Sequence, residues 1–317
     1  MKIIGTGRAH PAKVVTNAML EQFLDTSDEW IKTRTGMSER RVISSEKLED
    51  LAAEASLQAI ADAGLKPTDI DYIICSNVVN EYITPGLGCI VQGAIGAKCA
   101  CVDVNAACSG FIYALDMADD RLKSGKAKNI LVVAAEEPTR MVDWNDRSLC
   151  VLFGDGAGAV VVTEGEGMIC SRLTTASKID CLHYLRTLEP TPYITKEEYS
   201  APMYMNGKEV FKTAVLSSSR DIKVMLDEAC LKPSDIKYYV LHQANMRIIE
   251  AIANWLKLDM SHFPTNVERC GNTSSASVPL LLDELAREGK LQKGDKIRMS
   301  AFGAGFTTGA CIIEWTK

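Results

Sequence analysis

The chain has 317 residues, 47% of them hydrophobic, so it can bury a large core and has the length of two domains or two related halves. Its net charge of −6 and pI near 5.4 argue against a broadly basic surface, so we expect no nucleic-acid partner. No apolar run approaches the roughly 18 residues that a membrane-spanning helix needs. The N-terminal segment does not have the pattern of a signal peptide, so we expect a cytoplasmic protein without a membrane partner.

The 11 cysteines are scattered through a chain without an export signal, which is typical of free thiols in a reducing compartment. Cys99 and Cys101 fall on one predicted strand, which would point their thiols to opposite faces. Cys181 and His183 lack a second pair of ligands at zinc spacing. We therefore predict no metal site.

Taken in chain order, the predicted elements occur twice. An amphipathic helix over 51–64 leads through LKPTDIDYI (65–73) into an apolar strand. A second helix, over 217–230, leads through LKPSDIKYY (231–239) into another apolar strand. The repetition of this helix, turn and strand indicates an internal duplication.

Two further landmarks recur in the same order. One is a helix that ends at Gly125 or Gly289, and the other is a glycine-rich segment that begins at Phe153 or Phe302. The sequence therefore predicts an N-terminal half over 1–165 and a C-terminal half over 166–317. Because strands alternate with helices of ten or more residues, we expect an α/β fold with parallel sheets.

Cys108 lies where the short strand pattern CVDV and the turn NAA give way to an amphipathic helix. The apolar stripe of that helix consists of Phe111, Ile112, Leu115, Ala118 and Leu122. Free N–H groups and the positive end of the helix dipole favour a thiolate there, with a depressed pKa. They could also hold an oxyanion formed on an attacked carbonyl. The alternative is a buried cysteine that acts only as a small hydrophobic residue.

The duplication predicts two neighbours for Cys108. The corresponding position in the second half is Asn272, also at the start of a helix, and His242 follows the strand after LKPSDIKYY. Ligands gather beyond the carboxyl ends of strands in α/β sheets, so we expect these three side chains to meet. Alternatively, His242 is a core histidine and Asn272 a turn or cap residue.

Seven motifs, in order and across nearly the whole chain, resemble β-ketoacyl-acyl-carrier-protein synthase III. They are DTSDEWIKTRTGMSERR, NAACSGF, DRSLCVLFGDGAGAVVV, NGKEVFK, HQANMRII, GNTSSASVP and FGAGFTTGA. The resemblance implies a thiolase-like fold of five αβαβα layers with two similar halves, and a homodimer. It also implies the reaction that starts fatty-acid synthesis.

In that reaction Cys108 would accept an acyl group from acyl-CoA. His242 and Asn272 would bind the thioester oxygen of malonyl-acyl-carrier protein while CO₂ leaves, and the carbanion would attack the acyl-Cys108 thioester. The backbone N–H groups of Cys108 and Ala304 would form the oxyanion hole. Acyl-CoA is then a substrate, and no cofactor is expected.

The resemblance also assigns binding residues. Those expected to hold the coenzyme are Thr26, Trp30, Arg34, Arg147, Gly207 and Asn245. Without it, Trp30 would be a core aromatic after a capping box from Thr26 to Glu29. Those expected to meet the acidic carrier protein are Lys212, Arg247 and Lys257, with a solvated charged face as the alternative.

Several positions depart from the family pattern. Ala304 stands where a glycine is usual, Thr308 replaces a frequent tryptophan, and 171–193 does not match. Thr84 stands where many members place a phenylalanine that plugs the acyl pocket from the partner subunit, so a longer or branched primer is expected to fit.

Three other functions remain open at this point. The first is a secondary-metabolic condensing enzyme of the same fold with another acyl donor or acceptor. The second is a thiol hydrolase, because the order Cys, His, Asn also occurs in papain-like enzymes. The third is a protein that binds acyl groups or coenzyme A without catalysis.

Overall fold

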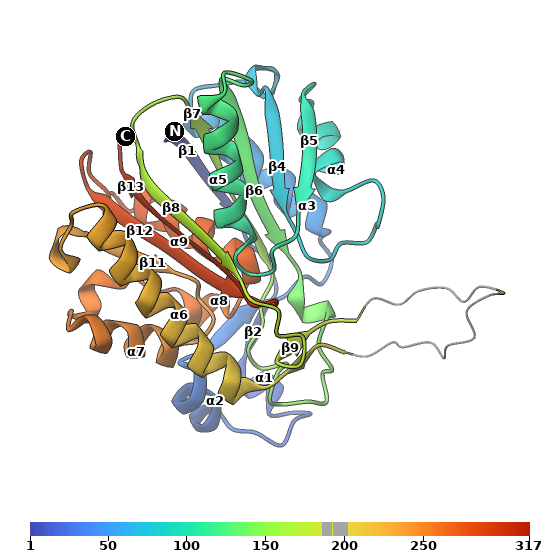
Figure 1. The fold of residues 1–317 in the computed structure, drawn as a ribbon. Coiled ribbons are helices and arrows are strands. Elements are labelled where there is room, and N and C mark those ends of the chain that lie inside the picture. Colours follow the sequence, from blue (N-terminus) through green and yellow to red (C-terminus); the bar gives the residue numbers. More distant parts are fainter. Residues whose placement is uncertain (186–191, 193–201) are drawn as a thin grey trace.

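The computed structural model describes residues 1–185, 192 and 202–317, and the stretch 171–193 lies partly outside them (Figure 1). A five-stranded sheet has the order β1-β7-β6-β4-β5, in which β4, β5 and β6 are parallel and β1 and β7 antiparallel to their neighbours. Its strands are β1 (Lys2–Ala9), β4 (Tyr72–Ser76), β5 (Ala100–Val104), β6 (Asn129–Glu136) and β7 (Gly156–Thr163).

The second sheet has four strands in the order β11-β12-β13-β8. Only β11 and β12 pair in parallel, while β13 is antiparallel to both neighbours. Its strands are β8 (Met168–Thr175), β11 (Tyr238–Leu241), β12 (Lys296–Gly303) and β13 (Thr307–Glu314). The expectation of parallel sheets is therefore wrong for β1 and β7 in the first sheet and for β13 and β8 in the second. The glycine-rich segments form β7 and β13, which return antiparallel beside β6 and β12.

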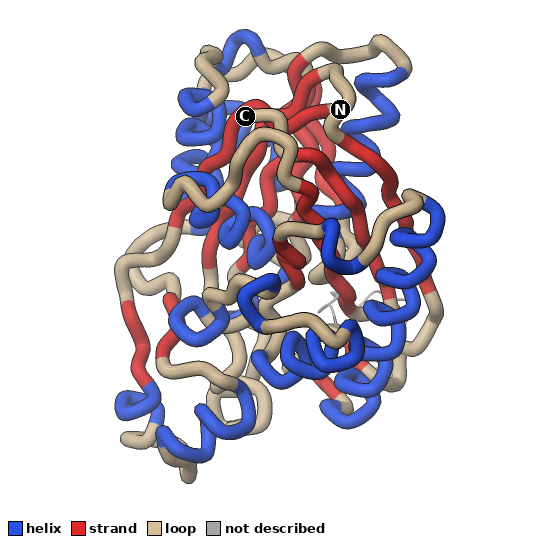
Figure 2. Tube along the Cα trace, turned by 90° about the vertical axis from the view of Figure 1, so that its left-hand side faces the viewer, coloured by secondary structure: helices blue, strands red, loops and turns tan. Residues whose placement is uncertain are grey.

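Helices separate and cover the two sheets, as the strands (red) and helices (blue) of Figure 2 show. The helices are α1 (Asn17–Leu20), α2 (Asp28–Thr35), α3 (Leu48–Asp62), α4 (Leu87–Ile95), α5 (Gly110–Lys123), α6 (Gly207–Glu228), α7 (Met246–Leu256), α8 (Val267–Cys270) and α9 (Ser277–Arg287). Helices α3 and α4 pack in one apolar cluster with the first sheet, and α6 and α7 in another with the second. Between the sheets lie α5 and α9, whose apolar side chains share one cluster with strands of both. This confirms the expected αβαβα layers.

The duplication is visible in the order of the strands. From β1, the first sheet continues with β7, β6 and β4. From β8, the second sheet continues with β13, β12 and β11, so corresponding strands follow in the same order. In each half the LKP segment leads into a 3₁₀ turn that is closed by a side-chain carboxylate. Asp69 accepts from the backbone N–H of Lys66, and Asp235 accepts from that of Lys232, both at 2.8 Å. Residue 165, where we divide the chain, lies between β7 and β8. That division stays a prediction.

Smaller elements lie at one end of the sheets. Strands β2 (Val14–Thr16) and β3 (Glu39–Arg41) pair, as do β9 (Leu182–His183) and β10 (Tyr204–Met205). Short 3₁₀ turns complete the description: Pro67–Asp69, Pro138–Arg140, Pro233–Asp235, Met260–His262 and Ser274–Ala276. No helix in the described part of the chain is both long and apolar enough to cross a membrane.

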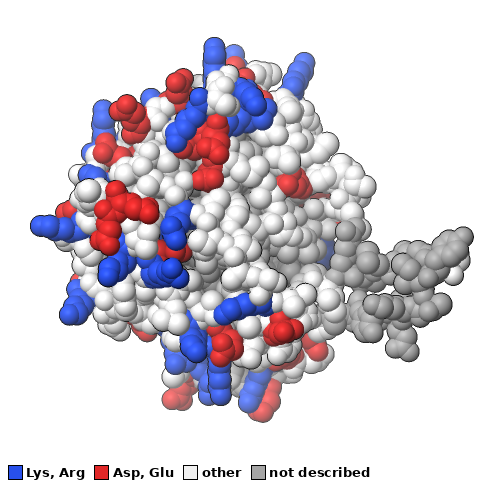
Figure 3. All heavy atoms as spheres, in the orientation of Figure 1, with Lys and Arg blue, Asp and Glu red and all other residues white. Residues whose placement is uncertain are grey.

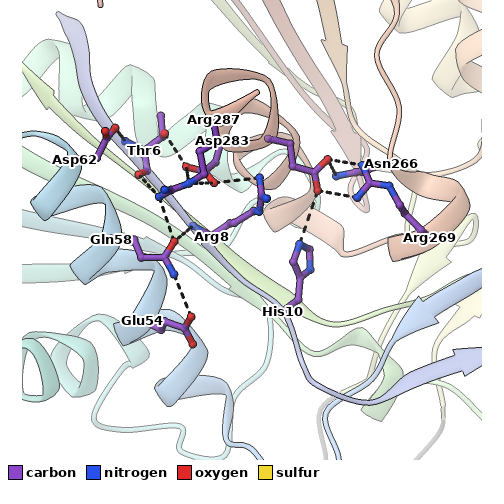
Figure 4. Close-up of polar contacts among 11 residues, drawn as sticks. Thr6, Arg8, His10, Glu54, Gln58, Asp62, Asn266, Arg269, Asp283 and Arg287 are labelled. Atoms are coloured by element: carbon purple, nitrogen blue, oxygen red, sulfur yellow. Dashed lines mark hydrogen bonds and ion pairs between the residues drawn. The ribbon is translucent and has the colours of Figure 1, made fainter. Parts of the chain in front are cut away.

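A buried ionic network fixes α9 against β1 (Figure 4). The Asp283 carboxylate is fully buried, and it accepts from the Thr6 hydroxyl at 2.7 Å and from Nε of Arg287 at 2.8 Å. Arg8 on β1 also lies 3.3 Å from it. The carboxylate therefore joins the first strand of the N-terminal half to the central helix of the C-terminal half.

Candidate active site

A cavity of about 1680 Å³ lies beyond the carboxyl ends of strands from both sheets. Cys108, His242 and Asn272 all line it. They come from the turn before α5, from the residue after β11 and from the turn before α9. The structure thus brings together the three side chains that the duplication predicted to be neighbours.

The Cys108 thiol sits at a strained turn. Ala107 has a φ of 49°, in the left-handed region that a non-glycine residue rarely adopts. Helix α5 begins at Gly110 with Ser109 as its N-cap, so Cys108 precedes the cap. Burial raises the pKa of the Cys108 thiol to about 12, and the charge of Glu136 adds to this rise. The depressed pKa expected from the helix dipole is therefore wrong, because desolvation outweighs it.

One serine links the thiol to a buried carboxylate that the sequence analysis missed, and a second serine binds the same carboxylate. The Ser274 hydroxyl is within hydrogen-bond distance of Cys108 Sγ, at 3.4 Å, and of Glu136 Oε1, at 3.3 Å. Ser275 donates to the same carboxylate oxygen at 2.6 Å, and Val78 N donates to the other at 3.1 Å. Burial raises the pKa of Glu136 to about 7. The available signal was its position at the end of an apolar strand beside the site.

The His242 imidazole is held in one tautomer. Nδ1 lies 2.7 Å from the Ser277 hydroxyl oxygen, which also accepts from Gln243 N at 3.3 Å. Within the described residues, Nδ1 is the acceptor in reach of that hydroxyl proton, so we assign the ring proton to Nε2. Burial lowers the pKa of His242 to about 3, so the ring is neutral at physiological pH. A neutral imidazole thus offers one N–H.

Asn272 offers a second N–H. Its side-chain oxygen Oδ1 accepts from Ser274 N at 2.9 Å, which fixes the orientation of the amide and leaves Nδ2 for a group in the cavity. Its backbone is held as well, since Asn272 N donates to Leu152 O at 2.8 Å. The same turn therefore positions the amide and carries the serine that contacts the thiol.

The loop after β12 approaches the nucleophile turn closely. A Cβ at Gly303 would lie 2.6 Å from Cys108 N and 2.8 Å from the Ala107 Cβ, so only a glycine fits. Ala304 follows directly and lines the cavity, and its carbonyl accepts from the Thr307 hydroxyl at 3.2 Å. Thr308, by contrast, is buried and donates to Asp221 at 3.2 Å.

Trp30 and Arg34 line the same cavity. Two guanidinium groups lie near the Trp30 indole: Cζ of Arg34 is 4.8 Å from its ring centroid, and Cζ of Arg147, which does not line the cavity, is 5.2 Å from it. Arg147 also donates to Asp25. Both guanidinium groups are therefore within reach of a cation–π contact with this indole.

Of the other three residues expected at the coenzyme, two line the cavity and one does not. Gly207, the first residue of α6, lines it, as does Asn245, the N-cap of α7, which donates to the Arg34 carbonyl at 3.2 Å. Thr26 does not line it, and its hydroxyl is buried without a hydrogen-bond partner in the described part of the chain. Ser27, not Thr26, caps α2, accepting from Trp30 N at 3.1 Å, so the capping-box alternative is wrong.

The three basic residues expected at the carrier protein are all exposed. Lys212 lies on α6 and Arg247 on α7, where its guanidinium is 5.9 Å from the Phe211 ring centroid. Lys257 is the C-cap of α7. Of the three basic residues, only Arg247 lines the cavity, as does its neighbour Phe211.

Thr84 is exposed and does not line the cavity within this single chain. Its neighbours Tyr82 and Ile83 do line it, and Ile83 is 72% exposed. An apolar side chain of that size in solvent is consistent with a surface that another subunit covers.

One cluster of potential metal ligands lies away from the cavity: His10, Cys270 and Glu284, with donor atoms within 4.8 Å of one another. Arg269 donates to both oxygens of Glu284, at 3.1 and 2.7 Å. Burial and the neighbouring arginines lower the pKa of His10 to about 4. The carboxylate already has a cationic partner, so this chemistry favours an ion pair over a metal ion.

Comparisons with known proteins agree on one family. Two family models match the chain: 3-oxoacyl-[acyl-carrier-protein] synthase III over residues 102–177, and its C-terminal model over residues 226–315. A β-ketoacyl-[acyl-carrier-protein] synthase III of Clostridium acetobutylicum is 45% identical over 100% of this chain and 99% of its own.

Solved structures agree as well. The crystal structure of 3-oxoacyl-[acyl-carrier-protein] synthase III from Aquifex aeolicus has a TM-score of 0.92 and 43% identity, covering 99% of both chains. The priming β-ketosynthase of the R1128 polyketide pathway has a TM-score of 0.92 and 33% identity, covering 100% of this chain and 96% of its own.

Proposed function

Since the chain belongs to the β-ketoacyl-acyl-carrier-protein synthase III family, and is thus an acyltransferase of the condensing type that initiates fatty-acid synthesis, we propose that it joins an acyl-CoA primer to malonyl-acyl-carrier protein through an acyl-Cys108 intermediate. The observation that carries the proposal is the shared cavity, in which one thiol faces two neutral N–H donors, His242 and Asn272. This set suits a thioester that is first transferred and then condensed.

In the first half-reaction, Cys108 Sγ attacks the carbonyl carbon of the acyl-CoA thioester. A new S–C bond forms, the bond to the coenzyme sulfur breaks, and the coenzyme leaves as a thiol after it takes up one proton. The backbone N–H of Cys108, beside Gly303, and that of Ala304 hold the oxyanion of the tetrahedral intermediate. Splitting the overall reaction in this way gives ping-pong kinetics.

In the second half-reaction, malonyl-acyl-carrier protein loses CO₂ and its thioester becomes an enolate. Nε2 of His242 and Nδ2 of Asn272 donate to the enolate oxygen, where negative charge develops. Because the lowered pKa keeps the ring neutral, His242 stabilises this charge as a hydrogen-bond donor and not as a cation. The carbanion attacks the acyl-Cys108 carbonyl, a C–C bond forms, and the thiolate of Cys108 leaves.

The donors and the nucleophile all come from the chain, so the proposed reaction uses acyl-CoA as a substrate and no resident cofactor. We propose that Trp30, Arg34, Arg147, Thr26, Gly207 and Asn245 hold the coenzyme. We also propose that Lys212, Arg247 and Lys257 meet the carrier protein. On the face in Figure 3, basic side chains are interspersed with acidic ones, so contact with an acidic carrier would depend on local positions.

We propose a homodimer in which the exposed loop at Thr84 enters the partner's acyl pocket. Strand β5 forms an edge of the first sheet, and no strand of the described chain pairs with its outer side. An open edge with exposed Tyr82 and Ile83 nearby suits pairing with a second copy.

The test is a reconstituted condensation. The protein is given isobutyryl-CoA with malonyl-acyl-carrier protein or with malonyl-CoA, and the products are identified by mass spectrometry beside Cys108→Ala and Asn272→Ala. A β-ketoacyl-carrier protein that requires Cys108 supports the proposal. Product only from malonyl-CoA would favour the secondary-metabolic alternative, which the similarity to the polyketide ketosynthase raises. Free acid without C–C bond formation would indicate a hydrolase, and binding without turnover a non-catalytic protein.

A further inference from the structure

A continuous chain of polar atoms runs from the Cys108 thiol into the protein interior. Ser274 Oγ lies 3.4 Å from Cys108 Sγ and 3.3 Å from Glu136 Oε1. The Glu136 side chain is 1% exposed. Ser274 itself has a φ of 51°, a conformation that serine rarely adopts and that the surrounding turn must maintain. One hydroxyl thus bridges the nucleophile and a buried carboxyl group.

The histidine in the cavity is not free to accept the thiol proton. In the tautomer assigned above, the Ser277 hydroxyl donates to Nδ1 of His242 and Nε2 carries the ring hydrogen, so neither ring nitrogen offers a lone pair to Cys108. The pKa of the Cys108 thiol is also raised to about 12, so little thiolate forms near neutral pH without a proton acceptor. The nucleophile therefore needs another proton acceptor.

We propose that Ser274 relays the proton of the Cys108 thiol to Glu136 when Cys108 becomes the nucleophile. The statement that Cys108 then accepts an acyl group rests on the function proposed above. Glu136 acts through Ser274, and only Ser274 touches the reacting sulfur.

The proton balance closes within these three residues. Before transfer, Cys108 S–H donates to Ser274 Oγ and the Ser274 hydroxyl donates to the Glu136 carboxylate. During transfer the thiol proton moves to Ser274 Oγ, while the hydroxyl proton of Ser274 moves to Glu136 Oε1. Afterwards Glu136 is a neutral acid and Ser274 donates to the thiolate. Once the coenzyme thiolate leaves, the proton returns through the same hydroxyl to protonate it.

Electrostatics couple the protonation of the two groups. As a carboxylate, Glu136 raises the pKa of the Cys108 thiol, and this repulsion disappears when Glu136 takes the proton. Burial raises the pKa of Glu136 to about 7, close to the value at which a proton acceptor is most effective near neutral pH. The titratable groups that face Glu136 are the thiols of Cys75 on β4 and of Cys108, and its other hydrogen-bond donors are Val78 N and the Ser275 hydroxyl.

The test is the pH profile of Cys108 alkylation by iodoacetamide. Peptide mapping by mass spectrometry separates Cys108 from the other ten cysteines. In the wild type the rate should rise through pH 7 as Glu136 loses its proton, and then level off. In Glu136→Gln and in Ser274→Ala the step near pH 7 should disappear. In Ser274→Ala, which keeps the Glu136 charge but loses the bridging hydroxyl, the rate at pH 7.5 should fall by about 100-fold. Glu136→Gln also removes the charge that raises the pKa of the thiol, so its rate should increase steadily with pH and show no plateau above pH 7.

Glu137→Gln is the matched control. Glu137 is the next residue along the chain, is also buried, and lies 3.3 Å from Arg140, but its carboxylate makes no hydrogen bond to Ser274. Its profile should keep the step near pH 7. Thermal unfolding of each variant shows whether the fold is retained. Loss of the step in Glu137→Gln as well, or a step that survives in folded Glu136→Gln or Ser274→Ala, would overturn the relay.

This outcome is separable from that of the proposed function. Iodoacetamide reports the thiolate without any acyl donor, so the relay can hold in a protein that accepts none of the acyl-CoA primers. Conversely, if Cys108 is acylated by acyl-CoA and Glu136→Gln leaves both the pH profile and the acylation rate unchanged, the relay is wrong while the condensing function stands.

Discussion

The Ser277 hydroxyl lies 2.7 Å from Nδ1 of His242 and thereby directs the opposite ring nitrogen, with its hydrogen, toward the cavity. Ser277 is the first residue of α9, so the start of a central helix sets the tautomer of a residue at the end of β11. The contact makes His242 a hydrogen-bond donor toward the cavity. The role of proton acceptor is then left to Glu136.

We predict that Ser277→Ala slows decarboxylation of malonyl-acyl-carrier protein by about tenfold or more, because His242 can then carry its proton on Nδ1. Acylation of Cys108 should stay within about twofold of the wild type, which a general loss of structure would not allow. The two half-reactions are measured separately, with Ser56→Ala, a buried serine of α3, as the control. Equal losses in both half-reactions would show that Ser277 only supports the fold.

A methyl group at position 303 should disable the nucleophile. Gly303→Ala would place its Cβ 2.6 Å from Cys108 N, so the turn that carries the thiol must shift. We expect Cys108 acylation to fall by about 100-fold or more, since displaced oxyanion donors cost this much. Gly93→Ala in α4, where a Cβ meets nothing within 4 Å, should leave the rate unchanged. Normal acylation of Gly303→Ala would contradict the proposed geometry.

The buried carboxyl group of Glu136 should also govern how stability depends on pH. Folding raises its pKa from 4.5 to about 7, so its contribution to stability is complete below pH 4.5 and is lost as the pH rises through 7. Glu136→Gln removes this loss. The free energy of unfolding of the variant minus that of the wild type should therefore increase by up to about 3 kcal/mol between pH 4.5 and pH 8. Denaturant titrations at both pH values measure this, and a constant difference between the proteins would mean that Glu136 has an ordinary pKa.

The ionic network of Asp283 predicts a large loss of stability. Asp283→Ala leaves Arg8, Arg287 and the Thr6 hydroxyl without their shared buried acceptor, which should cost about 3–5 kcal/mol. Glu288→Ala removes an exposed carboxylate 2.8 Å from Lys290 and should cost less than about 1 kcal/mol. Urea unfolding compares the two variants. Similar losses would show that the Asp283 network contributes no more than a surface pair.

Thr84 should set the size of the primer. If the partner's loop enters the acyl pocket, Thr84→Phe should reduce acylation by octanoyl-CoA at least tenfold, while acetyl-CoA stays within about twofold. Mass spectrometry of the intact protein measures both adducts. Equal rates for the variant and the wild type with octanoyl-CoA would place Thr84 outside the pocket.

The sequence predicted the parts of the fold and the site that depend on local pattern. The stripe on α5 is buried at every predicted position, from Phe111 to Leu122. Cys108, His242 and Asn272 line one cavity because each follows a strand or precedes a helix at the same end of the fold. The duplication made their meeting predictable without any knowledge of tertiary contacts.

What the sequence did not show depends on contacts between distant segments. Glu136 and Ser274 are 138 residues apart, and Ser277 matters only because β11 and α9 meet. The antiparallel pairing of β7 and β13 is set by the return of the chain after β6 and β12. The pKa of Cys108 was misjudged because the helix dipole can be inferred from sequence, whereas desolvation requires the packed cavity.

The most direct test of the central claim is the mass of the intact protein after incubation with acetyl-, isobutyryl- and octanoyl-CoA, beside Cys108→Ala. The account predicts one acyl adduct on the wild type, absent from Cys108→Ala and lost again when malonyl-acyl-carrier protein is added. An adduct that persists in Cys108→Ala, or no adduct with any of the three donors, would contradict Cys108 as the acyl acceptor.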